Sequence, residues 1–212
     1  MITVYTSLVG DRDECLPNQV PEGVHFEFFR DCYDKFKDDR RNSRPHKILA
    51  HQYINSEYSI YMDANIRLLV NPQYLIDKYL SDCDLAVWKH PSRDCLYDEA
   101  LACCKMKLDN VETIIEQVKK YEDEGFPKHK GLGECNVIFR RHTPKVEEFN
   151  NAWWSEYTRH SRRDQISFPY AADKVGIEYK LIPDFFIIDP NDPTKATKES
   201  GDFEIVAHTK NK

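Results

Sequence analysis

Short apolar runs alternate with longer helical patterns along most of this 212-residue chain. Seven runs are typical of strands and cover residues 2–6, 24–29, 57–62, 84–89, 135–140, 178–182 and 203–207. Helical patterns cover residues 45–54, 72–80, 95–106, 110–123, 144–158 and 163–174. Strands that alternate with helices favour βαβ construction. The pattern therefore predicts an α/β fold whose central sheet, built from these strands, is mixed but mostly parallel and flanked by helices.

The length suits one sizeable domain, and we treat residues 1–212 as a single unit. Only four residues, 209–212, follow His208 at the end of the last predicted strand, so we expect this unit to be the first domain of a longer polypeptide. Four zones are predicted to be rich in loops: residues 7–22, 30–43, 125–134 and 184–202. Long loops of an α/β domain are where substrates are expected.

Composition and charge exclude several classes of protein. The net charge of −6 argues against nucleic-acid binding, which normally needs a basic excess. There is neither an apolar run long enough to span a membrane nor a signal peptide, so we expect a soluble cytoplasmic protein. The seven cysteines are odd in number and form no C-x-x-C pair, which favours reduced thiols over disulfides or zinc.

The strand Tyr58–Met62 runs directly into Asp63, and Asn65 follows two residues later. In open α/β sheets, ligands bind beyond the carboxyl ends of the strands. Asp63 and Asn65 offer two hard oxygen ligands, which suit Mg²⁺ or Mn²⁺ bridging a diphosphate. The alternative is a simple Asx-type turn after a strand, and the spacing alone gives the two interpretations equal weight.

Two other strand ends are predicted at the same edge of the sheet. The first strand ends near Thr6 and Ser7, whose hydroxyls could hold a base and ribose, although threonine is also simply a good strand residue. Another strand ends before His90, which is a candidate substrate contact or an ordinary loop residue.

Arg44 and Lys47 flank the start of a predicted helix, with Pro45 at its first position. Helix N-termini favour anions, so these cations predict a phosphate contact. The equally weighted alternative is a solvated basic face paired with nearby acidic residues, namely Asp34, Asp38 and Asp39.

Polar groups also cluster around a glycine-containing segment and a later helix start. Glu134 follows Gly133, where the backbone can approach a ligand closely. Asp164 opens a helix and forms a predicted capping box with Ser161, so only its place in a folded cleft could make it a reacting group.

Two further features are an aromatic pair and a terminal histidine. At least one of Trp153 and Trp154 is predicted to lie in the core. His208 ends the last strand, and it is either a ligand for Mn²⁺ or a surface residue near the terminus.

Taken together, these segments resemble one group of glycosyltransferase-like domains, which are similar to GT-A enzymes of the family-8 kind. The similarity covers about residues 2–182 and extends to glycosyltransferase domains of large algal (chlorella) viruses, which decorate capsid proteins. The motifs that carry it stand at Arg44 to Lys47, Asp63-Ala64-Asn65, His90 to Arg93, Gly133-Glu134 and Arg162 to Gln165. The metal-binding Asp-x-Asp motif of these enzymes matches Asp63 to Asn65, with asparagine in place of the second acid.

The resemblance implies a role for each matched residue. The implied catalytic residues are Asp164, Gln165 and Glu134. The implied metal ligands are Asp63, Asn65 and His208, although the glycine and Lys-Pro-Trp that usually follow this histidine are missing. The implied nucleotide-sugar contacts are Thr6, Ser7, Asp11, Arg44, Lys47, Tyr61, Asp63, Ala64, His90 and Arg93.

The resemblance also implies an activity: metal-dependent transfer of a hexosyl or deoxyhexosyl group from a UDP-sugar to a glycan or glycoprotein, with retention. A virus-encoded enzyme of this kind would act in the host cytoplasm. Two alternatives stay open, a nucleotidyltransferase or nucleotide-sugar hydrolase on a similar sheet, and an inactive glycan-binding domain. The asparagine at position 65 favours the inactive glycan-binding domain, since a neutral oxygen attracts a dication less than a carboxylate does.

Overall fold

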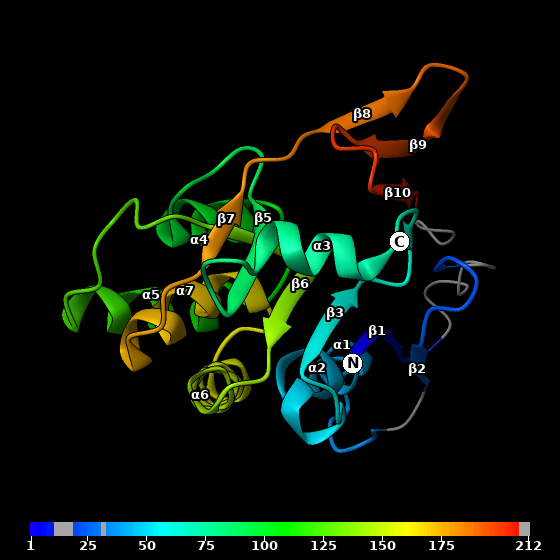
Figure 1. Cartoon of the computed structure of the whole chain (residues 1–212). Coiled ribbons are helices and arrows are strands. Elements are labelled where there is room, and N and C mark those ends of the chain that lie inside the picture. The colour runs from blue at the N-terminus through cyan, green and yellow to red at the C-terminus, as the bar shows by residue number, and fades with distance from the viewer. Residues whose placement is uncertain (11–18, 31–32, 208–212) are drawn as a thin grey trace.

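The centre of the protein is a six-stranded sheet, seen in a computed structural model that describes residues 1–10, 19–30 and 33–207 (Figure 1). The strand order is β2-β1-β3-β6-β5-β7. The strands are β1 (Ile2–Leu8), β2 (Phe26–Arg30), β3 (Tyr58–Met62), β5 (Leu85–Lys89), β6 (Gly133–Arg141) and β7 (Lys180–Ile182). Among these six strands, β6 is antiparallel to both of its neighbours, and the other pairs are parallel. The prediction of a mixed, mostly parallel sheet is therefore confirmed.

This topology decides where a site can form. The carboxyl ends of the five parallel strands lie at one edge of the sheet, and β6 begins at that same edge because it runs the opposite way. The end of β3 and the start of β6 are consequently neighbours.

A second, antiparallel sheet has the order β4-β10-β9-β8. Its strands are β4 (Ile66–Leu68), β8 (Phe186–Asp189), β9 (Asp192–Lys198) and β10 (Phe203–Val206), and in Figure 1 it lies beyond the arrowhead of β3. Two predictions are wrong here. The run 203–207 joins this small sheet rather than the central one, and the zone 184–202 contains a hairpin rather than loop alone. Prolines at positions 183, 190 and 193 suggest a loop, but the edge of a small sheet tolerates them.

All six predicted helices are present. They are α2 (Arg44–Ile48), α3 (Pro72–Tyr79), α4 (Leu96–Lys105), α5 (Val111–Asp123), α6 (Pro144–Arg159) and α7 (Asp164–Val175). The helix predicted over 45–54 breaks at Leu49, whose backbone leaves the helical region, and continues as the 3-10 turn Ala50–Gln52. A four-residue helix that was not predicted, α1 (Asp39–Asn42), lies in the loop zone 30–43 and is capped by the Asp38 side chain.

Two apolar layers cover the central sheet. Side chains alternate between its faces, so Ile60 and Met62 join a core with α3 and the small sheet, while Tyr61 joins a core with α2, α6 and α7. A third cluster packs α4 and α5 against α7. Trp153 is fully buried, as predicted. Within the described ranges, no helix combines the length and apolar character that a membrane crossing requires.

Candidate functional site

Asp63 is the first residue after β3, at the edge where the parallel strands end. Its backbone amide donates to the Asn136 carbonyl at 2.9 Å, and its own carbonyl accepts from the Ile66 amide at 3.0 Å. The backbone therefore turns after β3 through main-chain hydrogen bonds, whereas the side-chain hydrogen bonds of Asp63 and Asn65 go to Tyr61 and Val206 and do not form an Asx-type turn. The carboxylate accepts a hydrogen bond from the Tyr61 hydroxyl at 2.8 Å and stays about one-third exposed, with 32% of the side chain accessible. The turn thus presents an acid at the edge of the sheet.

A second carboxylate, Asp164, lies close to Asp63 through a shared lysine. The Lys47 ammonium is 2.6 Å from Asp164 Oδ2 and 3.9 Å from Asp63 Oδ1. Arg44 Nε lies 3.1 Å from the same Asp164 oxygen. Segments from α2, the end of β3 and the start of α7 therefore meet in one cluster of two acids and two bases, which we call the Asp63–Asp164 cluster (Arg44, Lys47, Asp63 and Asp164).

Two of the structural alternatives are wrong. Lys47 is nearly inaccessible and binds carboxylates of the cluster, so it is not part of a solvated basic face, and Asp38 pairs with Arg162 instead. Ser161 makes no capping box with Asp164, because its amide donates to Gln117 Oε1 at 3.2 Å and its hydroxyl accepts from the Arg163 amide at 3.2 Å. A charge-assisted hydrogen bond between a buried lysine and a buried aspartate is stronger than the contacts of a solvated basic face or of a capping box.

The charges of the Asp63–Asp164 cluster are fixed by their neighbours. Burial alone would raise the pKa of Asp164, but the charges of Lys47 and Arg44 outweigh this effect and hold that pKa well below its usual range. Burial and the adjacent Asp63 raise the pKa of Tyr61, so its hydroxyl keeps its proton and donates it. Asp164 is therefore a permanent carboxylate near neutral pH, suited to electrostatic stabilisation rather than to proton transfer.

Glu134 and Gln165, predicted beside the reacting carbon, are neighbours. The Gln165 amide donates to the Glu134 carbonyl at 2.7 Å, and Arg163 donates to the Gln165 oxygen at 3.0 Å. Gly133 is required just before, since a Cβ atom there would lie 2.6 Å from a methyl group of Val87. Burial raises the pKa of Glu134, an effect that the charge of Lys198 opposes.

His90 and Arg93 meet at a buried acid, Glu99, that the sequence motifs did not predict. Glu99, on α4, is 1% exposed, and its carboxylate lies 2.6 Å from Arg93 Nε and 3.6 Å from His90 Nε2. Arg163 Nη2 approaches it at 3.7 Å, which links this group to Gln165. An acid in the first turn of a helix is ordinary, so the sequence carried no signal that Glu99 is buried.

Thr6 and Ser7 lie near the end of β1 but are buried. The Ser7 hydroxyl is 3.2 Å from His46 Nδ1, and the His46 ring stacks on Phe29. Burial lowers the pKa of His46 to about 4, so this imidazole is neutral at neutral pH. Asp11 and His208, predicted as a donor contact and a metal ligand, lie outside the described residues.

Asn65 connects the turn after β3 to the small sheet. Its side-chain nitrogen donates to the Val206 carbonyl at 2.8 Å, and its carbonyl accepts from the Val206 amide at 3.0 Å. The side-chain oxygen is then the atom that could bind a cation. Ala64 is buried, and its carbonyl accepts from Gln19 at 3.2 Å, so its contribution is through the backbone.

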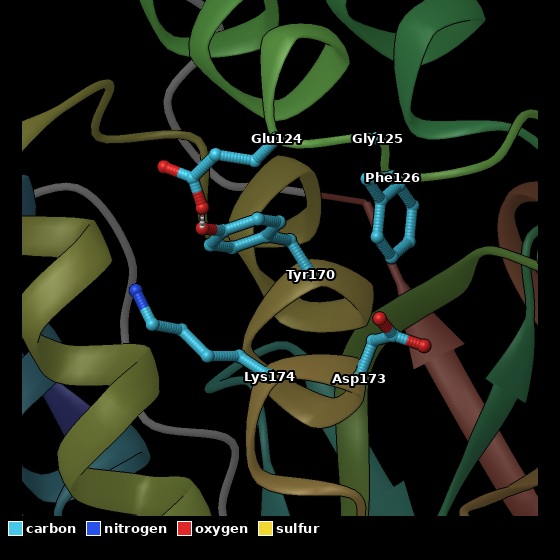
Figure 2. A pocket seen from close by; sticks show the side chains of 6 residues that line it. All are labelled: Glu124, Gly125, Phe126, Tyr170, Asp173 and Lys174. Carbon is cyan, nitrogen blue, oxygen red and sulfur yellow. Dashed lines mark hydrogen bonds between the residues drawn. The ribbon is translucent and has the colours of Figure 1, made fainter.

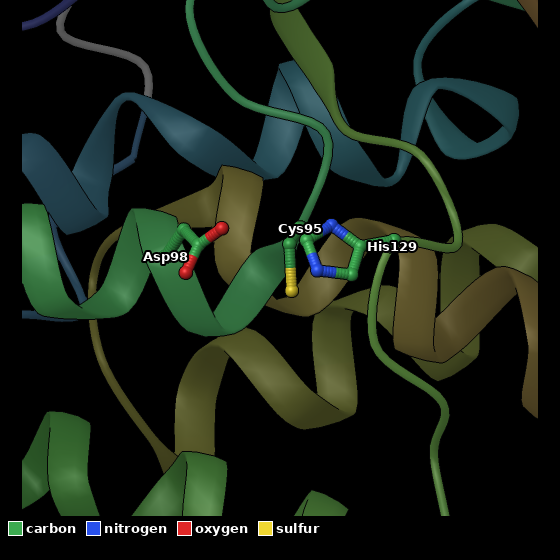
Figure 3. Close-up of side chains that lie close together, drawn as sticks. All are labelled: Cys95, Asp98 and His129. Carbon is green, nitrogen blue, oxygen red and sulfur yellow. The ribbon is translucent and has the colours of Figure 1, made fainter.

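Two other features are formed by residues that were not predicted to belong to the site. Figure 2 shows a hollow between the end of α5 and α7, lined by Glu124, Gly125, Phe126, Tyr170, Asp173 and Lys174. Figure 3 shows Cys95, Asp98 and His129, whose potential ligand atoms lie within 4.8 Å of one another. That set of donors suits zinc better than the Mg²⁺ or Mn²⁺ expected at Asp63. The five described cysteines, including Cys95, are free thiols.

Known proteins with similar sequences give the chain its family. The TOD1/MUCI70 glycosyltransferase-like domain matches residues 32–189. Probable hexosyltransferase MUCI70 from Arabidopsis thaliana is 30% identical over 164 residues, covering 72% of this chain and 28% of that protein. Alkaline ceramidase TOD1, also from Arabidopsis thaliana, is 28% identical over 147 residues, covering 64% of this chain and 32% of that protein. The chain thus spans about a third or less of the length of these relatives.

Solved structures with a similar fold include two transferases. One is a glycosyltransferase involved in glycosylation of the major capsid of PBCV-1, at a TM-score of 0.47 and 10% identity, covering 86% of this chain and 81% of that chain. The other is mouse xyloside xylosyltransferase 1 in its apo form, at a TM-score of 0.41 and 12% identity, covering 75% and 63%. At these TM-scores the similarity carries no information on substrates. The sequence match, which takes in Asp63, Glu134 and Asp164, covers well over half of the chain, and the protein therefore belongs to the TOD1/MUCI70 glycosyltransferase-like domain family.

Proposed function

We propose that this protein transfers a hexosyl group from a nucleotide-sugar, with UDP as the nucleotide, to a hydroxyl of a glycan. One observation carries the proposal: the Asp63–Asp164 cluster stands at the carboxyl edge of the sheet beside Glu134 and Gln165, in a chain of a glycosyltransferase-like family. One relative, named as a probable hexosyltransferase, and the family-8 resemblance support the same reaction class. The outcome of transfer is retention of configuration, and the acceptor is a glycan or a glycoprotein.

In this proposal the Asp63–Asp164 cluster binds and orients the donor. Asp63 and the side-chain oxygen of Asn65 would hold Mn²⁺ or Mg²⁺, with His208 as a third ligand. The fit is adequate on the described residues, because the Asp63 carboxylate is accessible and the hydrogen bond from the Asn65 side chain to Val206 uses its nitrogen, not its oxygen. A bound dication neutralises the charge that develops on the leaving diphosphate.

Asp164 acts as a fixed negative charge near the anomeric carbon. Its backbone is held by the Trp153 indole, which donates to the Asp164 carbonyl at 3.0 Å, and its side chain by Lys47 and Arg44. Such a rigid, ionised group can stabilise positive charge without reorganising. Lys47 is thus assigned to Asp164 rather than to phosphate, and the more accessible Arg44 and Arg93 are left for contacts with the donor.

Calorimetric titration with UDP tests the donor site. We expect binding to require Mn²⁺, to be lost in Asp63→Ala and to be kept in Cys95→Ser, because the second variant alters only the separate group in Figure 3. Binding of UDP that needs no metal would contradict the metal assignment. If UDP binding were lost in Cys95→Ser but kept in Asp63→Ala, the metal would instead be assigned to the group that contains Cys95.

Acceptor dependence separates transfer from its rivals. A nucleotide-sugar hydrolase would release UDP without an acceptor, a nucleotidyltransferase would release pyrophosphate, and a glycan-binding domain would release neither. One relative is named as an alkaline ceramidase, so hydrolysis of ceramide is a further rival activity. Release of a fatty acid would detect it. We expect UDP release only when a glycan acceptor is present.

A further inference from the structure

Lys198, at the end of β9, is a lysine buried between the two sheets. Its side chain is 1% exposed, and its ammonium lies 3.7 Å from the ring centroid of Trp88 on β5 and 3.7 Å from that of Phe186 on β8. Cation–π contacts of this kind offset only part of the cost of removing an ammonium from water. A methionine would fill the same space without that cost, so packing alone does not explain a charge here.

Two polar groups lie near the Lys198 ammonium, and one of them belongs to the predicted site residue Glu134. The ammonium lies 3.4 Å from the Asp184 carbonyl and 3.9 Å from Glu134 Oε2. That Glu134 oxygen is buried and has no hydrogen-bond partner among the described residues. Lys198 is therefore a buried cation next to the Glu134 carboxylate, while the Glu134 backbone carbonyl accepts from Gln165.

The two side chains alter one another's protonation. Burial lowers the pKa of Lys198 to about 8, against the attraction of Glu134 and Asp184. Burial raises the pKa of Glu134, and Asp63 raises it further, whereas Lys198 and Asn136 lower it. Without Lys198, burial and Asp63 would together favour the protonated, neutral form of Glu134.

We propose that Lys198 is a positioning residue of the transfer site, whose buried ammonium fixes the Glu134 side chain and keeps it a carboxylate toward the donor sugar. The inference rests on the proposed function, because it gives Glu134 a task in that reaction. It also gives the small sheet a role in the site, since β9 supplies a positive charge next to Glu134. Lys198 acts through Glu134 and does not touch the substrate, since its ammonium is inaccessible.

A double-mutant cycle tests whether Lys198 acts through Glu134. We expect Lys198→Met to lower kcat about tenfold in the wild-type background and less than twofold in the Glu134→Gln background. Lys198→Arg, which keeps the charge, should restore most of the activity. Lys195→Met is the matched control, because Lys195 lies on the same strand but is 42% exposed. If Lys198→Met does not fold, Lys198→Gln takes its place in the cycle.

Equal losses of kcat in the two backgrounds would overturn the proposal and leave Lys198 a structural residue. A second measurement does not depend on activity: the ¹³C signal of the Glu134 side-chain carboxyl, followed against pH in the full chain. We expect its midpoint to lie at higher pH in Lys198→Met than in the wild type and Lys195→Met. An unchanged midpoint would overturn the inference, whereas a shifted midpoint in a protein without transferase activity would refute only the proposed function.

Discussion

At the scale of single residues, the most informative observation is that Lys47 is buried against Asp164. A lysine next to the start of a helix suggests a surface phosphate contact, yet its side chain is only 3% exposed. The free energy of burying this charge is recovered through the 2.6 Å contact with an equally buried carboxylate. Lys47 therefore shapes the site from inside rather than from the solvent.

Lys47→Met should lower the free energy of unfolding by about 3 kcal/mol, because it leaves Asp164 buried with one cation fewer. Lys145→Met is the control: Lys145 is exposed on α6 and forms a surface pair with Glu148, so its loss should change stability by less than about 0.5 kcal/mol. Urea unfolding of the two variants measures the difference. Similar stabilities would show that Lys47 does not hold Asp164.

Lys198 predicts a dependence of stability on pH. Its pKa falls from 10.5 in the unfolded chain to about 8 in the folded protein. Between these values the unfolded state binds a proton that the folded state has released, so raising the pH favours the folded state. The wild type should gain on the order of 3 kcal/mol relative to Lys198→Met between pH 8 and 10.5. Denaturant unfolding across this range measures it, and a constant difference would contradict the shifted pKa.

At the scale of elements, the turn after β3 connects the two sheets. Asn65 pairs with Val206 through its backbone carbonyl and its side-chain nitrogen, which ties β10 to the edge where Asp63 stands. The small sheet thus contributes both a neighbour of the proposed metal site and, from β9, the charge of Lys198.

Asn65→Ala should therefore speed amide hydrogen exchange in β10, in the peptide around Val206, because the variant removes one of two hydrogen bonds that hold this strand to the turn. A gain of about tenfold in exchange rate corresponds to a typical hydrogen-bond contribution. Asn191→Ala, at the exposed turn between β8 and β9, serves as the control. Equal exchange in both variants would show that the side chain of Asn65 does not anchor β10.

The sequence predicted the elements of the central sheet better than those of the small one. The inner parallel strands β1 and β3 are buried on both faces, so they appear as largely apolar runs such as Tyr58–Met62. Strand β9 leaves most of its side chains partly or fully exposed and contains Pro193, so its residues carry no such pattern. This strand forms because its backbone pairs with its neighbours in the small sheet. The pattern of side chains along the sequence does not reveal such pairing.

At the scale of the whole molecule, the topology explains why some site residues were predictable. Asp63 and Asp164 could be selected because one follows a buried strand and the other opens a helix. Their shared partner Lys47, the acid Glu99 and the buried Lys198 depend on contacts between segments far apart in the chain. Residue patterns along a sequence do not encode such contacts.

Acceptor-dependent release of nucleoside diphosphate from a nucleotide-sugar tests the central claim most directly. The wild type should release UDP only with donor and glycan acceptor together, and Asp63→Ala should reduce the rate by about 100-fold. Asp82→Ala should match the wild type, because Asp82 is an exposed acid ahead of β5, at the opposite edge of the sheet. UDP release without an acceptor, or full transfer by Asp63→Ala, would contradict a transferase site built on the Asp63–Asp164 cluster.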